Sequence, residues 1–451
     1  MKVTVISMPV YHKVDKPGMA IIPPTAIYLL GEILRINGHE VDIIDPFYIR
    51  KLNPVEDENC EKLIDFFKKR LKNTDLVSIS SNTFNWSMTV IAIKVIKKIY
   101  PNKKIVVGGL HPTYFYKYVL ASTKADFVLA GDGEKSLLKL VNTIETNGEY
   151  ANVLGLVWKE GGQIVKNGEA ERLDREEIKE LPYPNFSYVP KDVYGIIPIE
   201  TSRGCRYGCR FCSIPHKHNW VGYDADWAAE RVLKIVHKYK KNFLHPYVYI
   251  VDDCFTVDND RAIKILQHIF ENNKDIRLTI EARASDLKNE KLIELLSYPQ
   301  ITRVAIGVEC GYNEGLKAIN KGLTIELLEE KIKLFEKYDL MKKVYFSFII
   351  GFPWETVDNY IQTIDYAASI VERFRYKNVN LNWLKIFPSQ IWEERMKYGI
   401  DLDESVYDNH NFSTDLYIFK RTHPRVNRYA RDFIFDYLKQ YEERGICLFN
   451  G

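Results

Sequence analysis

The sequence lacks the marks of a membrane, secreted or nucleic-acid-binding protein. No apolar run approaches the roughly 20 residues that a membrane-spanning helix needs. The 63 Lys and Arg residues nearly balance the 60 Asp and Glu residues, so net charge gives no case for nucleic acid as a partner. Seven cysteines form no paired framework of the kind that secreted disulfide scaffolds carry. The first residues read as a strand and not as a signal peptide, so we expect a cytoplasmic protein with no membrane span.

The 451 residues, 46% of them hydrophobic, are enough for about two to three domains. Three of the cysteines stand together in the run TSRGCRYGCRFC, as Cys205, Cys209 and Cys212. This CxxxCxxC spacing presents three thiols from one short loop. Structural zinc sites have four protein ligands, and iron-sulfur clusters are ordinarily held by four cysteines. Three thiols therefore predict a 4Fe-4S cluster whose last iron is open to another ligand.

Two other interpretations of the cysteine loop are a zinc site and chance clustering. His216 or His218 could supply a fourth zinc ligand, but zinc ligands usually come as spaced pairs, which favours the cluster. The remaining cysteines stand singly and are expected to be small apolar residues. They are Cys60, Cys254, Cys310 and Cys447.

The cysteine run resembles the signature of the radical S-adenosylmethionine (SAM) superfamily. In that superfamily the amine and carboxylate of SAM chelate the fourth iron, and an electron from the cluster cleaves the sulfonium. The resemblance implies that Cys205, Cys209 and Cys212 hold the cluster and that Phe211 belongs to the cofactor site.

Residues 1–148 alternate short apolar runs with amphipathic stretches, a pattern typical of a doubly wound α/β domain. Strands are expected at residues 3–7, 41–44, 76–80, 105–107 and 127–129, and helices at residues 24–36, 60–71, 88–100 and 134–144. Open α/β sheets bind ligands at the carboxyl ends of their strands, so the loops there are the places to look for a site.

Three such loops carry glycine, hydroxyl or proline residues, the first running to residues 21–25, the second at residues 80–84 and the third at residues 108–113, which residues 131–134 follow. Each loop alone is only a weak indication of a ligand site, because such turns occur in most doubly wound folds. Their order, together with residues 33–41, resembles the N-terminal cobalamin-binding domain that precedes the radical SAM domain in one branch of the superfamily. The residues that the resemblance places around cobalamin and its nucleotide tail are Ser80, Asn82, Thr83, Gly108, Gly109, His111, Gly131 and Glu134.

The Asp-x-His-x-x-Gly sequence, whose histidine binds cobalt in methionine-synthase-type domains, does not occur in this chain. We therefore expect no histidine on cobalt. His12, in the loop after the first strand, is expected to be a solvated loop residue, and the resemblance assigns His111 to a tail-binding loop and not to cobalt.

Residues 149–195 are expected to form a connector with a hairpin around Gly161 and Gly162. From residue 196 to 390 the alternation of strand and helix resumes, with the length expected of the partial (β/α)6 barrel that the cysteine loop implies by resemblance. The six expected strands lie at residues 196–200, 247–251, 278–281, 304–308, 344–350 and 379–386. Polar residues follow successive strands, where parallel barrels place their chemistry.

The resemblance gives several of these polar residues a role with SAM. Glu309 matches the carboxylate that holds the ribose hydroxyls, and Ser347 and Gly351 belong to the fifth strand and its Gly-x-Pro-x-Glu-Thr motif beside the adenine. Glu281 and Arg283 either pair with each other or meet the polar groups of SAM. For Asp252 and Asp253, capping of the following helix is as good an explanation as chemistry.

The chain departs from the family pattern at Arg206, at Trp354 and at residues 388–390, where Pro-Ser-Gln replaces Pro-Gly-Thr. The first two are expected to alter packing only, and the third leaves the substrate geometry open. Residues 391–451 contain an amphipathic helix around residues 425–443 and are expected to form a cap over the substrate.

These features together predict a cobalamin-dependent radical SAM enzyme, with a methyltransferase acting on carbon or phosphorus of a small molecule or peptide as the favoured reaction. The alternative within enzymes is ring contraction or oxidative cyclisation with the same cofactors. A metal-binding or electron-transfer protein without SAM chemistry is the alternative from another class. An enzyme of this kind needs an electron donor, such as flavodoxin or ferredoxin, as a partner.

Overall fold

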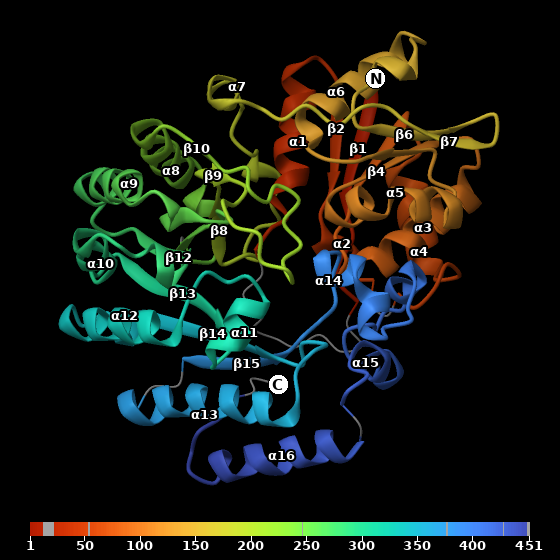
Figure 1. The fold of residues 1–451 in the computed structure, drawn as a ribbon. Coiled ribbons are helices and arrows are strands. Elements are labelled where there is room, and N and C mark those ends of the chain that lie inside the picture. Colours follow the sequence, from red (N-terminus) through yellow and green to blue (C-terminus); the bar gives the residue numbers. More distant parts are fainter. Residues whose placement is uncertain (12–21, 53–54, 246, 376–377, 427, 449–451) are drawn as a thin grey trace. The chain divides into compact units, whose positions relative to one another are not determined.

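Short apolar strands and amphipathic helices alternate along both halves of the chain, as the sequence predicts. The computed structural model describes residues 1–11, 22–52, 55–245, 247–375, 378–426 and 428–448. They divide into two compact units (Figure 1). Unit 1 contains Met1–Gly195 and two later segments, Lys241–His245 and Asp403–Phe412, whereas unit 2 contains the rest. The two units are therefore interleaved along the chain.

Unit 1 is built on a seven-stranded sheet in the order β2-β1-β3-β4-β5-β6-β7. Its strands are β1 (Lys2–Ser7), β2 (Glu40–Ile44), β3 (Leu76–Ser80), β4 (Lys104–Gly108), β5 (Phe127–Leu129), β6 (Leu156–Glu160) and β7 (Gln163–Lys166). Its helices are α1 (Thr25–Ile36), α2 (Pro46–Arg50), α3 (Glu61–Arg70), α4 (Trp86–Ile99), α5 (Leu110–Ser122), α6 (Gly133–Glu145) and α7 (Arg175–Lys179). Consecutive residues of β1 are buried, as expected of a parallel strand covered on both faces.

The strands β2, β1, β3, β4 and β5 are mutually parallel, and the β6–β7 hairpin adds two antiparallel strands at one edge. This confirms the predicted doubly wound domain. The strand order reverses between β1 and β3, and folds of this order bind ligands outside the carboxyl ends of the strands at such a reversal.

The main difference from the prediction in unit 1 is at residues 108–113, which were expected to form a loop. Helix α5 already begins at Leu110. Pro112 lies in the first turn of this helix, where the missing N–H of proline breaks no hydrogen bond. The loop after β4 is consequently shorter than the sequence indicates.

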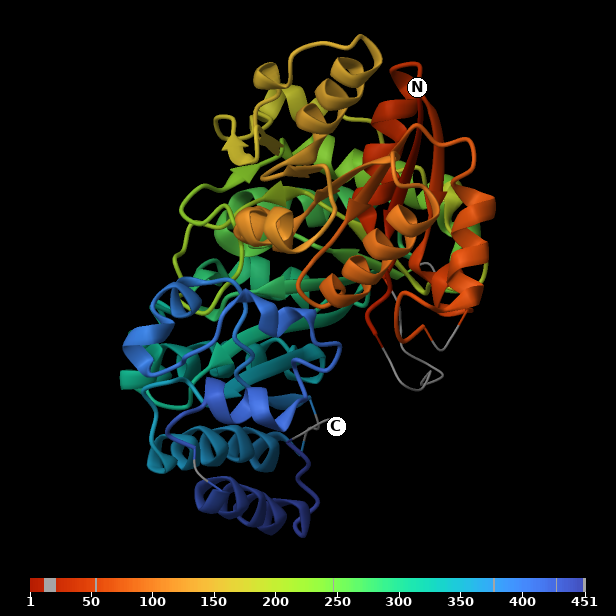
Figure 2. The same ribbon diagram turned by 90° about the vertical axis from the view of Figure 1, so that its right-hand side faces the viewer.

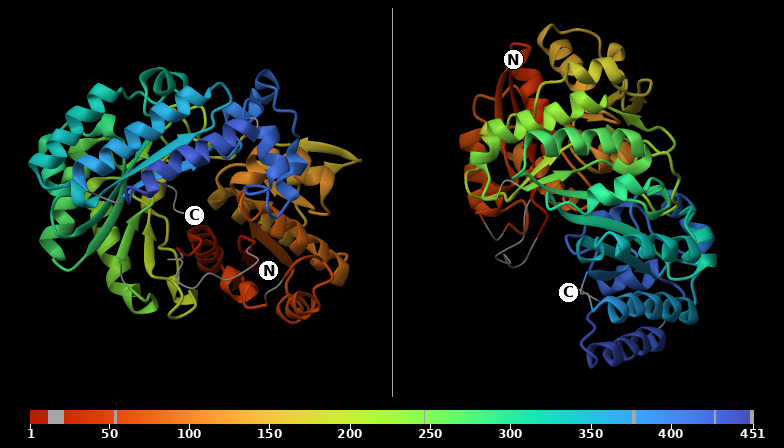
Figure 3. Two further views of the ribbon diagram at one scale, coloured as in Figure 1. Left: turned by 90° about the horizontal axis from the view of Figure 1, so that it is seen from below. Right: turned by 90° about the vertical axis from the view of Figure 1, so that its left-hand side faces the viewer.

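Unit 2 contains a six-stranded parallel sheet in the order β15-β14-β13-β12-β11-β8, so each strand pairs with the next one along the chain. The strands are β8 (Ile196–Ile199), β11 (Tyr247–Ile250), β12 (Arg277–Ala282), β13 (Ile301–Glu309), β14 (Val344–Ile350) and β15 (Val379–Trp383). The helices that follow them include α8 (Ala225–Tyr239), α9 (Asn259–Asn272), α10 (Glu290–Leu296), α11 (Asn313–Ala318), α12 (Ile325–Lys337) and α13 (Val357–Phe374). Figure 3 shows the helices along the outer side of the curved sheet, which confirms the partial (β/α)6 barrel.

The sixth strand is shorter than predicted. It ends at Trp383 because the neighbouring strand β14 ends at Ile350, which is the residue opposite Trp383. A small two-stranded ribbon, β9 (Ser202–Arg203) with β10 (Val221–Gly222), encloses the cysteine loop.

The C-terminal residues divide between the two units. Helix α16 (Arg428–Glu442) lies along α13 (Figure 2), and the hydroxyls of Tyr437 and Tyr441 both donate to Asp365 at 2.7 Å. The preceding segment, Asp403–Phe412, instead belongs to unit 1, where Tyr407 is buried. None of the helices in the described part of the chain has the length and apolarity needed to cross a membrane.

Candidate active site

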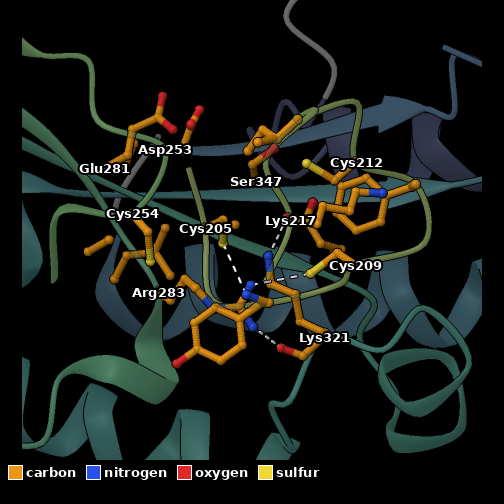
Figure 4. A pocket seen from close by; sticks show the side chains of 18 of the residues that line it. Cys205, Cys209, Cys212, Lys217, Asp253, Cys254, Glu281, Arg283, Lys321 and Ser347 are labelled. Atoms are coloured by element: carbon orange, nitrogen blue, oxygen red, sulfur yellow. Dashed lines mark hydrogen bonds and ion pairs between the residues drawn. The ribbon is translucent and has the colours of Figure 1, made fainter. Parts of the chain in front are cut away.

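A cavity of about 390 Å³ opens at the carboxyl ends of the unit 2 strands. The sulfur atoms of Cys205, Cys209 and Cys212 meet there with charged side chains from β12, β13 and the turns that follow them (Figure 4). Its lining residues are Cys205, Tyr207, Cys209, Phe211, Cys212, Ile214, Lys217, Asp253, Cys254, Glu281, Ala282, Arg283, Arg303, Ala305, Ile306, Gly307, Glu309, Lys321, Tyr345 and Ser347.

The two aspartates after β11 hold the start of the cysteine loop. Asp252 is fully buried and accepts hydrogen bonds from the backbone N–H of Thr201 and from its hydroxyl, both at 2.5 Å. Asp253 accepts from the backbone N–H of Gly204 at 3.0 Å. The capping explanation for this pair is wrong, because Asp258 caps α9 by accepting from the Arg261 N–H.

Gly204 lets the loop turn sharply just before the first cysteine. Its φ is +74°, and a Cβ there would lie 2.3 Å from the carbonyl oxygen of Asn219. The Cys205 N–H donates to the His216 carbonyl at 3.1 Å, so the turn that follows the three cysteines fixes the loop from its other side. Among the described residues, no three His, Cys, Asp or Glu side chains converge as they would on a single metal ion.

The sulfur atoms of the loop have hydrogen-bond donors beside them. Arg283 Nη1 donates to Cys209 Sγ at 3.3 Å, and the Tyr207 N–H donates to Cys205 Sγ at 3.4 Å. A hydrogen bond with the Cys254 thiol lowers the pKa of Cys205 to about 7, whereas burial raises the pKa of Cys212 to about 11. Thiolates are the form in which cysteines bind metals, so donors at two of the three sulfurs suit a bound cluster.

The expectation that Cys254 is only a small apolar residue is incorrect, since its thiol lies in this cavity with the cysteines of the loop. The residues next to Cys254 in the sequence do not predict this position, because Cys254 and Cys205 are about 50 positions apart along the chain.

Glu309 occupies a strained position at the end of β13. Its φ is +76°, which is rare for a residue with a side chain, and it coincides with an irregularity in the pairing of β13 with β14. The side chain is buried and pairs with Lys321 Nζ at 2.7 Å. Strain of this kind is common at ligand sites, and Glu309 lines the cavity.

Phe211, Ser347, Glu281 and Arg283 also line the cavity. The suggested pairing of Glu281 with Arg283 is wrong. Glu281 accepts from the hydroxyl of Tyr249, and Arg283 instead donates to the sulfur of Cys209 and to the carbonyl of Lys321.

Gly351 lies outside the residues that line the cavity. Its φ is +91°, and a Cβ would lie 2.7 Å from the ring of His423. The loop is held by Glu355, which accepts from the N–H groups of Gly351 and Phe352 at 2.8 Å and from the hydroxyl of Tyr312 at 2.9 Å. Burial raises the pKa of Glu355 to about 7.

In unit 1 the predicted cobalamin residues lie at the carboxyl ends of β3, β4 and β5, in the turns that follow these strands and in the first turns of α5 and α6. Gly109 has φ +101°, and a Cβ there would lie 2.5 Å from the Ser81 carbonyl oxygen, so the two loops touch through their backbones. Asn82 closes its own turn by accepting from the Phe84 and Asn85 N–H groups. Ser80 and Gly108 are the last residues of β3 and β4, Thr83 and Gly131 lie in the turns after β3 and β5, and Glu134 lies in the first turn of α6.

His111 is completely buried. Its ring stacks on Trp86 at a centroid distance of 4.5 Å and meets Tyr407 edge-on. Burial lowers the pKa of His111 to about 3, so the ring is neutral, and within the described chain its Nε2 has no hydrogen-bond partner. Backbone loops in close contact and an unsatisfied buried nitrogen fit a bound polar group such as the cobalamin tail. His12 lies outside the described residues.

Two family models match this chain. Residues 19–141 match the B12 binding domain, and residues 199–367 match the Radical SAM superfamily. An uncharacterized methyltransferase of Pyrococcus horikoshii is 28% identical over 82% of this chain and 78% of its own length. The anaerobic magnesium-protoporphyrin IX monomethyl ester cyclase of Cereibacter sphaeroides is 24% identical over 79% of this chain, which spans 58% of that protein.

Among solved structures, the radical SAM methyltransferase TsrM from Kitasatospora setae has a similar fold. It matches with a TM-score of 0.66 and 18% identity, over 88% of this chain and 77% of its own. The cofactors of this class are a 4Fe-4S cluster, SAM and cobalamin. With a B12-binding domain and a radical SAM domain in one chain, the protein belongs to the cobalamin-dependent radical SAM enzymes.

Proposed function

We propose that this enzyme is a methyltransferase that methylates an unactivated carbon, or phosphorus, of a small molecule or peptide. The observation that carries the proposal is the cavity of unit 2, where three thiols of one loop face charged side chains in a chain that also has a B12-binding domain. The relative from Pyrococcus horikoshii is also named a methyltransferase. When bound, the cluster and SAM supply a 5′-deoxyadenosyl radical, and cobalamin supplies the methyl group.

The residues of the cavity suit these cofactors by their chemistry. Cys205, Cys209 and Cys212 would hold the cluster, and Arg283 would orient Cys209. The Glu309 carboxylate has one oxygen on Lys321 and further acceptor capacity for the ribose hydroxyls of SAM. Phe211, Ser347 and Glu281 would complete the SAM site, and the loop around Gly351 would border the adenine.

The loops of unit 1 would hold cobalamin through backbone and small polar groups. The residues that would do so lie at the strand ends, in the turns or at the start of the next helix, and they are Ser80, Asn82, Thr83, Gly108, Gly109, Gly131 and Glu134. The family resemblance assigns His111 to the tail-binding loop, and its unsatisfied Nε2 is the polar atom that it would offer to the tail. A reduced flavodoxin or ferredoxin would supply the electrons.

The test begins with anaerobic reconstitution of the full chain. We expect about four iron and four sulfide per chain. A variant with Cys205, Cys209 and Cys212 all replaced by alanine is expected to lose the cluster absorbance and all SAM cleavage while keeping cobalamin. A triple variant that retains the cluster, or zinc in the site of protein prepared without oxygen, would contradict the proposal.

A second candidate is cyclisation without methyl transfer, which the similarity to the magnesium-protoporphyrin cyclase favours. SAM with a labelled methyl group separates the two. A methyltransferase is expected to label cobalamin and to form S-adenosylhomocysteine as well as 5′-deoxyadenosine. A cyclase would form 5′-deoxyadenosine alone and leave the cobalamin unlabelled.

A further inference from the structure

The cavity of unit 2 contains an arginine that the proposed cluster and SAM sites leave unassigned. Alternate residues of β13 line this cavity, and they are Arg303, Ala305 and Gly307, before the strand ends at Glu309. A parallel strand rises roughly 3.3 Å per residue, so Arg303 lies about 20 Å along the strand from Glu309. Arg303 therefore borders the cavity far from the carboxylate that would hold the ribose of SAM.

The guanidinium of Arg303 stacks on the ring of Tyr345, which lines the same cavity from the neighbouring strand β14. Its central carbon lies 3.8 Å from the centre of that ring. In the strand pairing Tyr345 is opposite Ala305, two residues beyond Arg303, so the arginine reaches along the sheet to make this contact. A guanidinium that stacks by its face keeps the N–H groups of its edge available as donors.

Among the described residues, none accepts a hydrogen bond from Arg303, and no carboxylate forms an ion pair with it. Lys321, another cation of the cavity, is paired with Glu309. The Glu281 carboxylate on β12 accepts from the hydroxyl of Tyr249 and forms no ion pair with Arg303. Arg303 is exposed, and its guanidinium is charged at every pH at which the protein is folded. The cavity thus offers a permanent positive charge with unused donors.

We propose that Arg303 binds an oxyanion of the substrate, a carboxylate or a phosphate, so that the substrate is an anionic molecule. The planar guanidinium can donate two parallel hydrogen bonds to two oxygens of either group. The assignment rests on the proposed function, because it places the methyl acceptor in the cavity that holds the cluster and SAM. It narrows the class of acceptor from any small molecule or peptide to those that carry such a group.

The charges along the neighbouring strand give the substrate a direction. Thr279 is opposite Arg303, and Glu281 follows two residues later, closer to the carboxyl end of β12. The negative charge of Glu281 disfavours an oxyanion near the strand ends, whereas Arg303 attracts one farther down the strand. The anionic group therefore binds away from the cysteine loop, and the rest of the substrate extends toward it.

The test measures the binding of two probes, benzoate and phenyl phosphate, to the reconstituted full chain with SAM bound and no reductant, by isothermal titration calorimetry. We expect at least one probe to bind the wild-type protein, and the two probes distinguish a carboxylate site from a phosphate site. Arg303→Gln should weaken this binding about tenfold or more, because a charged donor is lost. Arg303→Lys keeps the charge but not the planar pair of donors, so its affinity should lie between those of the other two proteins.

Arg277→Gln is the matched control, because Arg277 is an arginine of the neighbouring strand β12 that lies outside the residues lining the cavity. Its affinity for the probes should equal that of the wild-type protein. Three results would overturn the assignment: no binding of either probe, equal binding by the wild-type protein and Arg303→Gln, or displacement of the probe by SAM. Weaker SAM binding by Arg303→Gln would also overturn it, by placing Arg303 in the SAM site. A wild-type chain that takes up no cluster would overturn the proposed function, whereas the dependence of probe binding on Arg303 is measured separately.

Discussion

At the scale of single residues, Glu355 shows how one buried carboxylate can hold a loop at the end of a barrel strand. It is inaccessible to solvent and receives three hydrogen bonds, two from the backbone of the Gly-x-Pro-x-Glu-Thr motif and one from Tyr312. Burial raises its pKa from the ordinary 4.5 to about 7, since desolvation outweighs these hydrogen bonds.

This raised pKa predicts how Glu355 contributes to stability across pH. Between about pH 4.5 and 7 the folded protein keeps a proton that the unfolded chain releases, so the contribution of Glu355 falls as pH rises through this window. We expect the free energy of unfolding of the wild-type protein, relative to Glu355→Gln, to fall by about 3 kcal/mol over that range. Urea unfolding at several pH values measures it.

Glu330→Gln is the control for this measurement, because Glu330 is an exposed carboxylate on α12. The free energy of unfolding of Glu330→Gln, relative to that of the wild-type protein, should stay nearly constant over the same pH range. If the free energy of unfolding of Glu355→Gln, relative to the wild-type protein, were equally independent of pH, the buried carboxylate would not be protonated in the folded protein.

At the scale of elements, the turn between β4 and α5 depends on one glycine. A Cβ on Gly109 would meet the Ser81 backbone, which cannot move without disturbing β3, whereas a Cβ on Gly38 would meet nothing within 4 Å. Both residues have positive φ, where alanine is strained, and Gly109 with ψ −171° lies in a region that is almost exclusive to glycine, so the backbone alone costs about 1–3 kcal/mol. Only Gly109→Ala adds a steric clash, which we expect to lower the free energy of unfolding by a further ~1–3 kcal/mol.

Hydrogen–deuterium exchange in β4 and α5 reports this difference within unit 1. Gly109→Ala should speed exchange there and weaken cobalamin binding, and Gly38→Ala should leave cobalamin binding unchanged. Equal effects of the two variants would mean that the Gly109 turn can relax away from Ser81.

The helices and strands were largely predictable from the sequence, but the contacts between residues far apart in the sequence were not. The bounds of β3, β5 and β14 agree with prediction because alternation and burial are local properties of the chain. The cysteine loop was equally visible, since its three thiols are close in sequence. The contacts of Cys254, Asp286 and Lys321 join residues far apart in sequence, and only the folded barrel brings these residues together.

At the scale of the whole molecule, unit 1 is completed by a segment from near the end of the sequence. Asp408 accepts from Trp86 Nε1 at 2.7 Å and from the hydroxyl of Tyr118, which are 322 and 290 residues away along the chain. Tyr407 packs beside it against His111 and Phe115. The domain that carries the B12 match therefore depends on residues outside that match.

Asp408→Ala tests this dependence in the full chain. The substitution leaves the buried Trp86 N–H without its acceptor. We therefore expect the stability of unit 1 to fall by about 1–3 kcal/mol, which would appear as faster hydrogen exchange in α4 and α5. Exchange in β13 and β14 of unit 2 should be unchanged. Glu404→Ala, in the same segment, is the control. A similar effect of both variants would show that the hydrogen bonds of Asp408 do not stabilise unit 1.

The late segment also sets an order of events during synthesis on the ribosome. When Gly195 has been made, the sheet of unit 1 is present but Tyr407 and Asp408 are not, and about 200 more residues must be added first. At ~5–20 residues per second this takes roughly 10–40 s. During that interval Trp86 lacks its acceptor and His111 lacks the ring of Tyr407, so unit 1 reaches its final packing only after nearly all of the barrel has been translated.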